Sequence, residues 1–281
     1  PLMVIHDART SRIPWETVTL GETAKPYFPT AETGLSRKYE AEDLSVAKWL
    51  EERRLAEKLS VLLVVDPTED LPGAVLEGDS IEAILAADPS VTLTVLRQSA
   101  ATLAALRAAF RSGRYDVVHY AGHAFFDPVD RTRSGLVCHG DVVLTGKEVA
   151  RLEHLPALVF FNACESARIR DGQPATRRDG RLKTPGERDD GRGTAARIET
   201  NIGLAESLLR AGVANYLGTY WPVGDDAALA FGRAFYTEIA RGASIGEALQ
   251  SGRTAVRAEK SVDWADYVHY GSPGFRIKSR G

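Results

Sequence analysis

Two side chains with acid–base or nucleophilic chemistry each follow a short apolar run in this sequence. His123 comes shortly after Val117–Tyr120, and Cys164 comes shortly after Leu158–Phe161. Such runs are typical of buried parallel strands, whose carboxyl ends meet at the edge of a sheet where ligands bind. We therefore expect His123 and Cys164 to project from the same edge. A thiol beside an imidazole can act as a cysteine nucleophile, because the ring takes the thiol proton and later returns it to the leaving group.

Cysteine and histidine also occur as inert core residues, and this alternative applies to both sites. Cys138 fits it, because it lies in an alternating apolar segment. His119 lies inside a predicted strand, where a hydrogen-bonded core histidine is expected. The other histidines are expected to be structural or exposed: His6, His139, His154 and His269.

Backbone groups near the two residues have expected roles as well. The oxyanion that forms on attack of a carbonyl needs hydrogen-bond donors held in place. The backbone N–H groups of Ala124 and Cys164 can supply them if the two strands end side by side. Gly122 is expected to permit a sharp bend next to His123, and Asn162 is expected to support the turn rather than take part in the chemistry.

The surrounding sequence alternates between predicted strands and helices. Strands are expected at 61–65, 91–96, 117–120, 158–161 and 213–220, and helices at 40–58, 71–87, 100–110, 201–210 and 225–241, with another from Ser244. Glu148 and Glu247 complete capping boxes with Thr145 and Ser244, and a hairpin is expected around Gly140-Asp141. The alternation predicts an α/β fold with a parallel sheet covered by helices on both faces.

Composition excludes several classes of protein. The chain has 281 residues, 44% hydrophobic and 26% charged, with a net charge of -3, which is ordinary for a globular protein and lacks the basic character of a nucleic-acid binder. No apolar stretch approaches the roughly 18 residues of a membrane helix. The two cysteines show no metal-ligand spacing. We expect a cytoplasmic protein with no metal, cofactor, membrane contact or direct nucleic-acid contact.

Two regions stand apart from the regular pattern. Residues 1–58 are expected to form an irregular extension with one helix, or the end of a preceding domain, and residues 59–281 to form the main domain. Because the chain begins at Pro1 with a strand-like run, we expect a piece of a longer protein. Residues 168–199 are rich in charged residues, Gly and Pro, so a flexible insertion is expected there.

The segments His119-Tyr-Ala-Gly-His123-Ala and Phe161-Asn-Ala-Cys164-Glu-Ser resemble the CHAT family of caspase-like cysteine peptidases, which is related to separase. Further similar segments follow in the order typical of that family. They are Gly203–Val213, Gly218–Asp225 and Trp264–Pro273. The resemblance implies a caspase-like three-layer sandwich, with a mostly parallel central sheet flanked by helices.

The resemblance also implies roles for individual residues. His123 would be the general base and Cys164 the nucleophile, with the N–H groups of Ala124 and Cys164 as the oxyanion hole. Asp225, with its neighbour Asp226, matches the acidic residue that binds a basic side chain before the scissile bond. The alternative for Asp225 is the N-cap of the following helix. Glu165 either shapes the pocket or faces solvent.

The implied function is a cysteine endopeptidase that cleaves a protein partner, after Arg or Lys, under the control of a sensor domain or partner. A bacterial defence or regulated-death context is expected from the resemblance alone. Residues 168–199 match the position of the cleavable linker of caspases, so they are either a self-cleaved activation segment or a tolerated insertion. The alternatives are a non-catalytic sensor or scaffold, and a nucleotide binder, which the acidic residues 66–70 disfavour.

Overall fold

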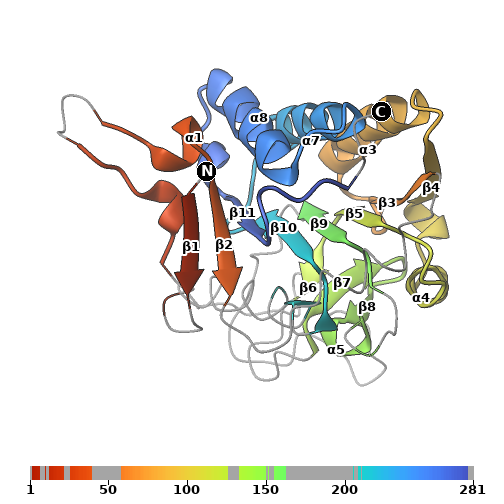
Figure 1. Ribbon diagram of the computed structural model, residues 1–281. Helices are drawn as coiled ribbons and strands as arrows, with labels where there is room; N and C mark the ends of the chain where they lie inside the picture. Colours follow the sequence, from red (N-terminus) through yellow and green to blue (C-terminus); the bar gives the residue numbers. More distant parts are fainter. Residues whose placement is uncertain are drawn as a thin grey trace.

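An eight-stranded sheet forms the centre of the computed structural model (Figure 1). The structure describes residues 2–6, 10, 13–21, 26–39, 58–125, 133–149, 151, 155–162, 205, 208–209 and 211–277. The strand order is β1-β2-β11-β10-β9-β5-β3-β4. The bounds are Leu2–His6 (β1), Leu35–Tyr39 (β2), Leu59–Val65 (β3), Val91–Arg97 (β4), Val117–Ala121 (β5), Leu158–Asn162 (β9), Asn215–Thr219 (β10) and Tyr267–Tyr270 (β11).

The sheet consists of two parallel blocks that run in opposite directions. β10, β9, β5, β3 and β4 pair in parallel, as do β1, β2 and β11, and the two blocks meet where β10 and β11 pair antiparallel. The expected mostly parallel sheet is therefore confirmed. The antiparallel strand β11 was not expected from the sequence.

Each strand of the parallel block supplies two separate cores, because successive side chains point to opposite faces. In β3, Val61, Leu63 and Val65 pack with one cluster, whereas Leu62 and Val64 pack with the other. No alternation of polar and apolar residues is needed when both faces are buried. This explains why β3 is a continuous apolar run.

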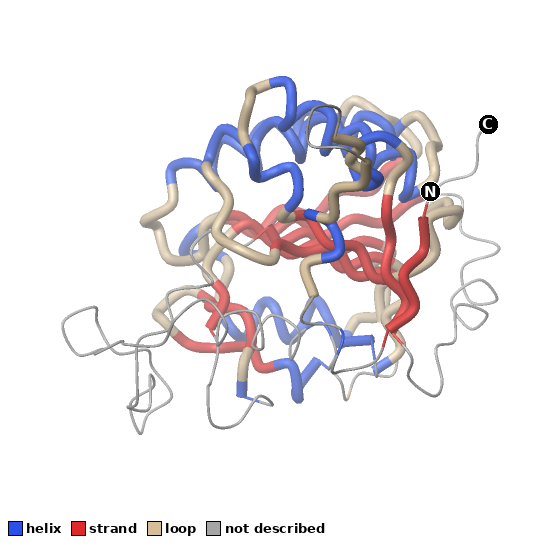
Figure 2. Tube along the Cα trace, turned by 90° about the vertical axis from the view of Figure 1, so that its left-hand side faces the viewer, coloured by secondary structure: helices blue, strands red, loops and turns tan. Residues whose placement is uncertain are grey.

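Helices cover the first face, and a helix with a small second sheet covers the other, which gives three layers (Figures 1 and 2). The first face carries α3 (Pro72–Ala86), α7 (Asp225–Ala240) and α8 (Ile245–Ala258). The second face carries α4 (Leu103–Arg111) and the sheet of β6 (Ala124–Phe125), β7 (Gly135–Cys138) and β8 (Val142–Thr145), which leads into α5 (Gly146–Val149). The remaining short elements are η2 (Trp15–Thr17), α1 (Pro29–Glu32), η3 (Gln98–Ala100) and η6 (Val262–Ala265).

Local sequence signals set most of the element boundaries. Both expected capping boxes form, at Thr145 with Glu148 and at Ser244 with Glu247. Gly140 and Asp141 have positive φ angles of 80° and 59°, as the tight turn of the expected hairpin requires. α4 begins later than expected, because η3 precedes it and Thr102 then caps it. The helix expected at 40–58 and most of the helix expected at 201–210 lie outside the described residues.

The expectation of an irregular N-terminal segment is wrong for residues 2–6 and 35–39, which form strands. β1 and β2 extend the central sheet, and β2 pairs with β11 through Arg37 and Tyr270. The long-range partner of these strands is the C-terminal end of the chain, so no local periodicity could predict the pairing. The division of the chain after residue 58 stays a prediction, and the charged insertion at 168–199 lies outside the described residues.

A buried ion pair ties the N-terminal strands to the core. Arg37 of β2 donates from Nε to Glu16 at 2.9 Å and makes a second contact through Nη2, and both side chains are fully buried. The guanidinium also lies over the rings of Tyr220 and Tyr270. Burial alone would lower the pKa of Arg37, but the attraction of Glu16 outweighs it and raises the pKa. The arginine therefore stays charged and depends on its partner.

Glu16→Ala is expected to lower the free energy of unfolding by about 3–5 kcal/mol, because it leaves the Arg37 charge buried without its counterion. Urea denaturation of the purified protein measures the change. Glu238→Ala removes a carboxylate from an exposed pair with Arg241 and should lower stability by less than about 1 kcal/mol. A loss for Glu16→Ala as small as that control would show that the pair does not hold the N-terminal strands.

Candidate active site

The carboxyl ends of β3, β5 and β9 lie level with one another at one edge of the sheet. Val65 pairs with Ala121, and Ala121 pairs with Asn162. His123 follows Ala121 by two residues and so lies at the edge that the sequence predicted. In sequence, Cys164 follows Asn162 by the same interval. Cys164 and Glu165 themselves lie outside the described residues.

Contacts from β5 and β7 hold the backbone of His123 in place. Its carbonyl oxygen accepts a hydrogen bond from the backbone N–H of Val137 at 3.0 Å. The hydroxyl of Tyr120 lies 2.6 Å from the same oxygen and 2.7 Å from the carbonyl oxygen of Val137. Burial raises the pKa of Tyr120 well above its usual value, so the hydroxyl keeps its proton as a donor. Ala124, the expected oxyanion donor, follows directly in β6 and pairs with Leu136.

The chain bends at Gly122 as expected, but glycine is required there for space. A Cβ atom at this position would lie 2.7 Å from the Tyr120 hydroxyl and 2.9 Å from Cδ of Pro67. Gly122 is absent from the glycines with positive φ, so its backbone does not need the left-handed region. The expected reason for this glycine is thus corrected: the loop after β3 packs directly over it.

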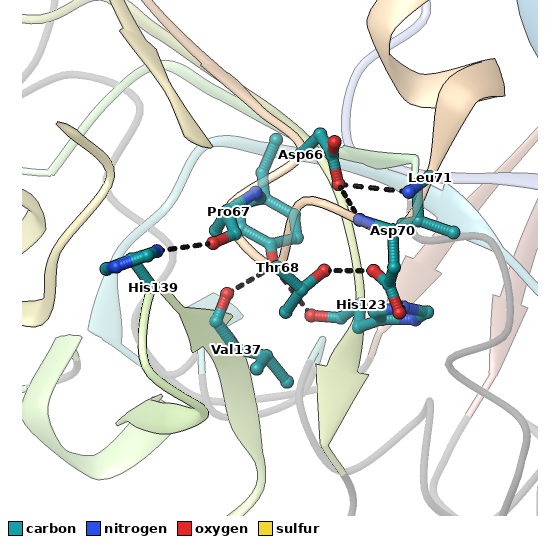
Figure 3. A network of polar contacts seen from close by, with 9 residues as sticks. Asp66, Pro67, Thr68, Asp70, Leu71, His123, Val137 and His139 are labelled. Carbon is teal, nitrogen blue, oxygen red and sulfur yellow. Dashed lines mark hydrogen bonds and ion pairs between the residues drawn. The ribbon is translucent and has the colours of Figure 1, made fainter. Parts of the chain in front are cut away.

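The side chain of His123 meets a carboxylate that the sequence did not predict. Its Nε2 atom lies 3.1 Å from Oδ1 and 3.2 Å from Oδ2 of Asp70, on the loop after β3 (Figure 3). The His123 side chain is 20% exposed and that of Asp70 is 61% exposed. Partial burial raises the pKa of Asp70, but a hydrogen bond from Thr68 and the attraction of His123 outweigh this and lower the pKa. Asp70 is therefore an anion beside the imidazole.

A second aspartate fixes the loop that carries Asp70. Asp66, directly after β3, accepts hydrogen bonds from the backbone N–H groups of Asp70 and Leu71, both at 3.1 Å (Figure 3). Asp66 and Glu69 have φ angles of 46° and 63°, in the left-handed region where Asp is tolerated and Glu is rare. The loop is thus a compact turn that leads into α3. The sequence signal that could have indicated this carboxylate is the acidic stretch 66–70, which directly follows a predicted strand.

A buried polar cluster lies beneath the edge, between the sheet and α3. Asn162 donates from Nδ2 to Oε1 of Glu77 at 2.7 Å. His119 lies 3.1 Å from the Tyr236 hydroxyl through Nδ1 and 3.3 Å from Glu77 through Nε2, although the second contact is too poorly aligned for a hydrogen bond. His119 is therefore the core histidine that was expected. Asn162 anchors the end of β9 to α3, which agrees with its expected supporting role.

Asp225 and Asp226 lie exposed in the first turn of α7, beyond the end of β10. The N-cap is Gly224, whose N–H donates to Asp263 at 3.0 Å, so the alternative in which Asp225 caps the helix is wrong. The Asp225 carboxyl group packs against Gly73 in the first turn of α3, where a Cβ atom would clash with it. Asp225 therefore lies next to the start of the helix that the Asp70 loop leads into.

Cys138 is the inert thiol that was expected. It is fully buried in β7, and burial raises the pKa of its thiol to about 12. Within the described parts of the chain, no three or more His, Cys, Asp or Glu residues are grouped so that they could hold a metal ion. A search of the same residues finds no helix with the length and apolar character needed to cross a membrane.

Comparison with known proteins gives one family and one fold. A family model for the CHAT domain matches residues 1–272. Two crystal structures of the Saccharomyces cerevisiae separase–securin complex contain a similar chain, with TM-scores of 0.54 and 0.53 and 18% sequence identity in both. Each match covers 96% of this chain but only 15% of the other. No curated protein matches the chain. The likeness to separase confirms the expected caspase-like architecture.

An unusual carboxyl group lies near the same edge. Asp266 precedes β11, its carbonyl oxygen accepts the N–H of Tyr220 at 2.8 Å, and only 9% of the residue is exposed. Burial, followed by repulsion from Asp263 and Glu16, raises the pKa of Asp266 to about 7. In the unfolded chain the pKa is about 3.9. The folded state therefore binds an extra proton between these two values.

Because the folded state binds that proton more tightly, ionisation of Asp266 should lower stability as pH rises from about 4 to 7, with no further change above. Asp266→Asn should therefore stabilise the protein by a margin that grows over this window to the order of a few kcal/mol at pH 8. Thermal melts from pH 4 to 8 measure it. Asp141→Asn, at an exposed turn position, is the matched control. An equal gain at pH 4 and 8 would contradict a titration effect.

Proposed function

Since the chain belongs to the CHAT domain family, we propose that it is a cysteine endopeptidase that cleaves a protein partner through a His123–Cys164 pair. The observation that carries the proposal is the register of β5 with β9, in which Ala121 lies opposite Asn162. The two catalytic side chains each follow this matched pair by two residues. A partly exposed imidazole beside an ionised carboxylate is suited to take a proton from a thiol.

The proposed reaction has two stages. His123 takes the proton of Cys164, and the thiolate attacks the carbonyl carbon of the scissile amide, which forms an oxyanion held by the N–H groups of Ala124 and Cys164. The imidazolium returns its proton to the leaving amine as the C–N bond breaks, and a thioester remains. A water molecule, deprotonated by His123, then attacks the thioester and releases the acid and the thiol.

Asp225 is the proposed determinant of cleavage after Arg or Lys, with Asp226 and Glu165 contributing negative charge. A carboxylate can bind the guanidinium of Arg through two parallel hydrogen bonds. The exposure of Asp225, and its place at the carboxyl end of β10, support this role. Its packing against Gly73 also holds it next to the Asp70 loop.

Control by a second protein or by a sensor domain is part of the proposal. The similar structures contain separase together with securin, and this chain spans only a small part of the separase length. These observations support a peptidase whose activity depends on a partner. Its place in the cytoplasm, in a bacterial defence or regulated-death context, is proposed from the family alone. Cleavage within residues 168–199 is a proposed means of activation.

Two other functions compete with this proposal. A non-catalytic sensor or scaffold would keep the fold without turnover, and the reactivity of the Cys164 thiol separates it from an enzyme. A nucleotide binder would need free N–H groups at the start of a helix. After β3, the N–H groups of Asp70 and Leu71 already bind the Asp66 carboxylate, which disfavours a phosphate at that position.

Cys164→Ala and His123→Ala are each expected to abolish cleavage of fluorogenic peptides varied at the residue before the scissile bond. Both residues follow strand ends, so the melting temperature should change little. Cys138→Ala should retain activity, because its buried thiol lies outside the site. If no peptide is cleaved, a thiol-reactive probe distinguishes a latent enzyme, in which Cys164 labels quickly, from a non-catalytic module, in which it does not.

Asp225→Asn should lower kcat/KM for Arg and Lys peptides by roughly 10- to 100-fold, because it removes a charge-assisted hydrogen-bonded contact. Cleavage of any peptide with a neutral residue at this position should change little. The same peptide library measures both. Equal loss on all substrates, with a lower melting temperature, would assign Asp225 to the packing of α7 against α3 instead.

A further inference from the structure

We propose that Asp70 is a positioning residue for His123: it holds the ring in the form with the proton on Nε2, so that Nδ1 exchanges a proton with the nucleophile. The proposal deepens the proposed function and rests on it. Both carboxylate oxygens of Asp70 lie within 3.2 Å of Nε2. The site would then consist of three groups rather than the two that the sequence predicted.

The charge of Asp70 determines which ring nitrogen carries the proton. A neutral imidazole has one N–H donor and one acceptor nitrogen, and an ionised carboxylate can only accept. The contact is therefore favourable when Nε2 carries the hydrogen, which leaves the lone pair on Nδ1. Once Nδ1 has taken a second proton, the nearby negative charge stabilises the imidazolium. Asp70 thus favours both states that a general base must pass through.

The loop is built to keep Asp70 in place and ionised. Asp66 fixes the backbone at Asp70 and Leu71, and the Thr68 hydroxyl donates to Oδ1 of Asp70 at 2.5 Å. On the opposite side, the backbone of His123 is held by β5 and β7. Both partners are therefore held by contacts that do not depend on their own pairing, which is the arrangement that catalytic positioning requires.

Other titratable groups lie around the pair from each element that packs on it. Asp66 and Glu69 belong to the same loop, and Tyr120 lies beneath it on β5. His139, next to β7, contacts the carbonyl oxygen of Pro67 (Figure 3). It also lies 3.5 Å from Glu69. Within the described part of the chain, these groups make no side-chain hydrogen bond or ion pair with the His123 ring, whereas Asp70 does. Its effect on the ring can therefore be tested separately.

If the contact between Asp70 and His123 only stabilised the fold, replacing Asp70 would lower the melting temperature. Asp70 is mostly exposed, and an exposed ion pair contributes little to folding stability. Its replacement should leave the melting temperature nearly unchanged. A large loss of function without loss of stability would then be an effect on His123 itself.

The decisive experiment compares Asp70→Asn, Asp70→Glu and Glu69→Gln with the wild-type protein, all in the Cys138→Ala background. The rate of Cys164 alkylation by iodoacetamide is measured from pH 5 to 10, which reports the thiolate without any need for a substrate. kcat and KM on the best peptide are measured alongside. Glu69→Gln removes a charge from the same loop and is the matched control.

Asp70→Asn should shift the rise of alkylation to higher pH by roughly one unit, because the imidazolium that stabilises the thiolate loses its anionic partner. kcat should fall by roughly 10²- to 10⁴-fold, the range for loss of a general base or of its orienting carboxylate. Asp70→Glu, which keeps the carboxylate, should recover part of both, and Glu69→Gln should match the wild type.

An Asp70→Asn protein with the alkylation profile and kcat of the wild type would overturn the proposal, as would an equal shift in Glu69→Gln. Failure of the proposed function would give a different experimental result. In that case the wild type cleaves no peptide, but the alkylation profiles of the wild type and Asp70→Asn can still be compared: a difference supports the role of Asp70, and identical profiles overturn it.

Discussion

The pairing of β5 between β3 and β9 decides where His123, Asp70 and Asn162 lie. Parallel strands in register end at one edge, so Val65, Ala121 and Asn162 lie side by side there at the ends of their strands. Most side chains of these strands below the edge are apolar and pack into the two cores. His123 and Asp70 come together because of this register, although they are far apart in the chain. A shift of register in β3 would move Asp70 away from the ring.

Polar side chains near the edge form hydrogen bonds at two depths. Asp66 saturates the backbone at the start of α3, and Asp70 is thereby presented to His123. Deeper in the molecule, Glu77 of α3 holds Asn162 at the end of β9. The same helix thus supports both strand ends on either side of β5, which gives α3 a larger part in the site than its own sequence indicates. Buried hydrogen-bonded networks of this kind favour one arrangement over others.

The N-terminal strands extend this architecture rather than flank it. Arg37 joins β2 to Glu16 and to the rings of Tyr220 and Tyr270. Arg253 of α8 donates to the carbonyl oxygens of Leu35 and Tyr267, so a helix on one face bridges β2 and β11. Tyr220 begins the loop that leads to Asp225, and its ring lies against the Arg37 guanidinium. The position of this loop therefore depends on the buried pair of Arg37 and Glu16. Stability of the sheet edge and geometry near the proposed specificity residue depend on the same contacts.

The sequence by itself determined what depends on local chemistry. Periodicity, turn residues and caps act over a few residues. They predict the strands β3, β4, β5, β9 and β10, the helices α3, α4, α7 and α8, the hairpin at Gly140-Asp141, the capping boxes and the position of His123. The partner of His123, the strands β1, β2 and β11, and the reason for Gly122 were decided by the tertiary structure. Each depends on groups far apart in the chain: Asp70 meets His123 through strand register, Arg37 meets Tyr270 across the sheet, and Pro67 packs over Gly122. Such contacts carry no sequence period, because only the fold brings the partners within reach.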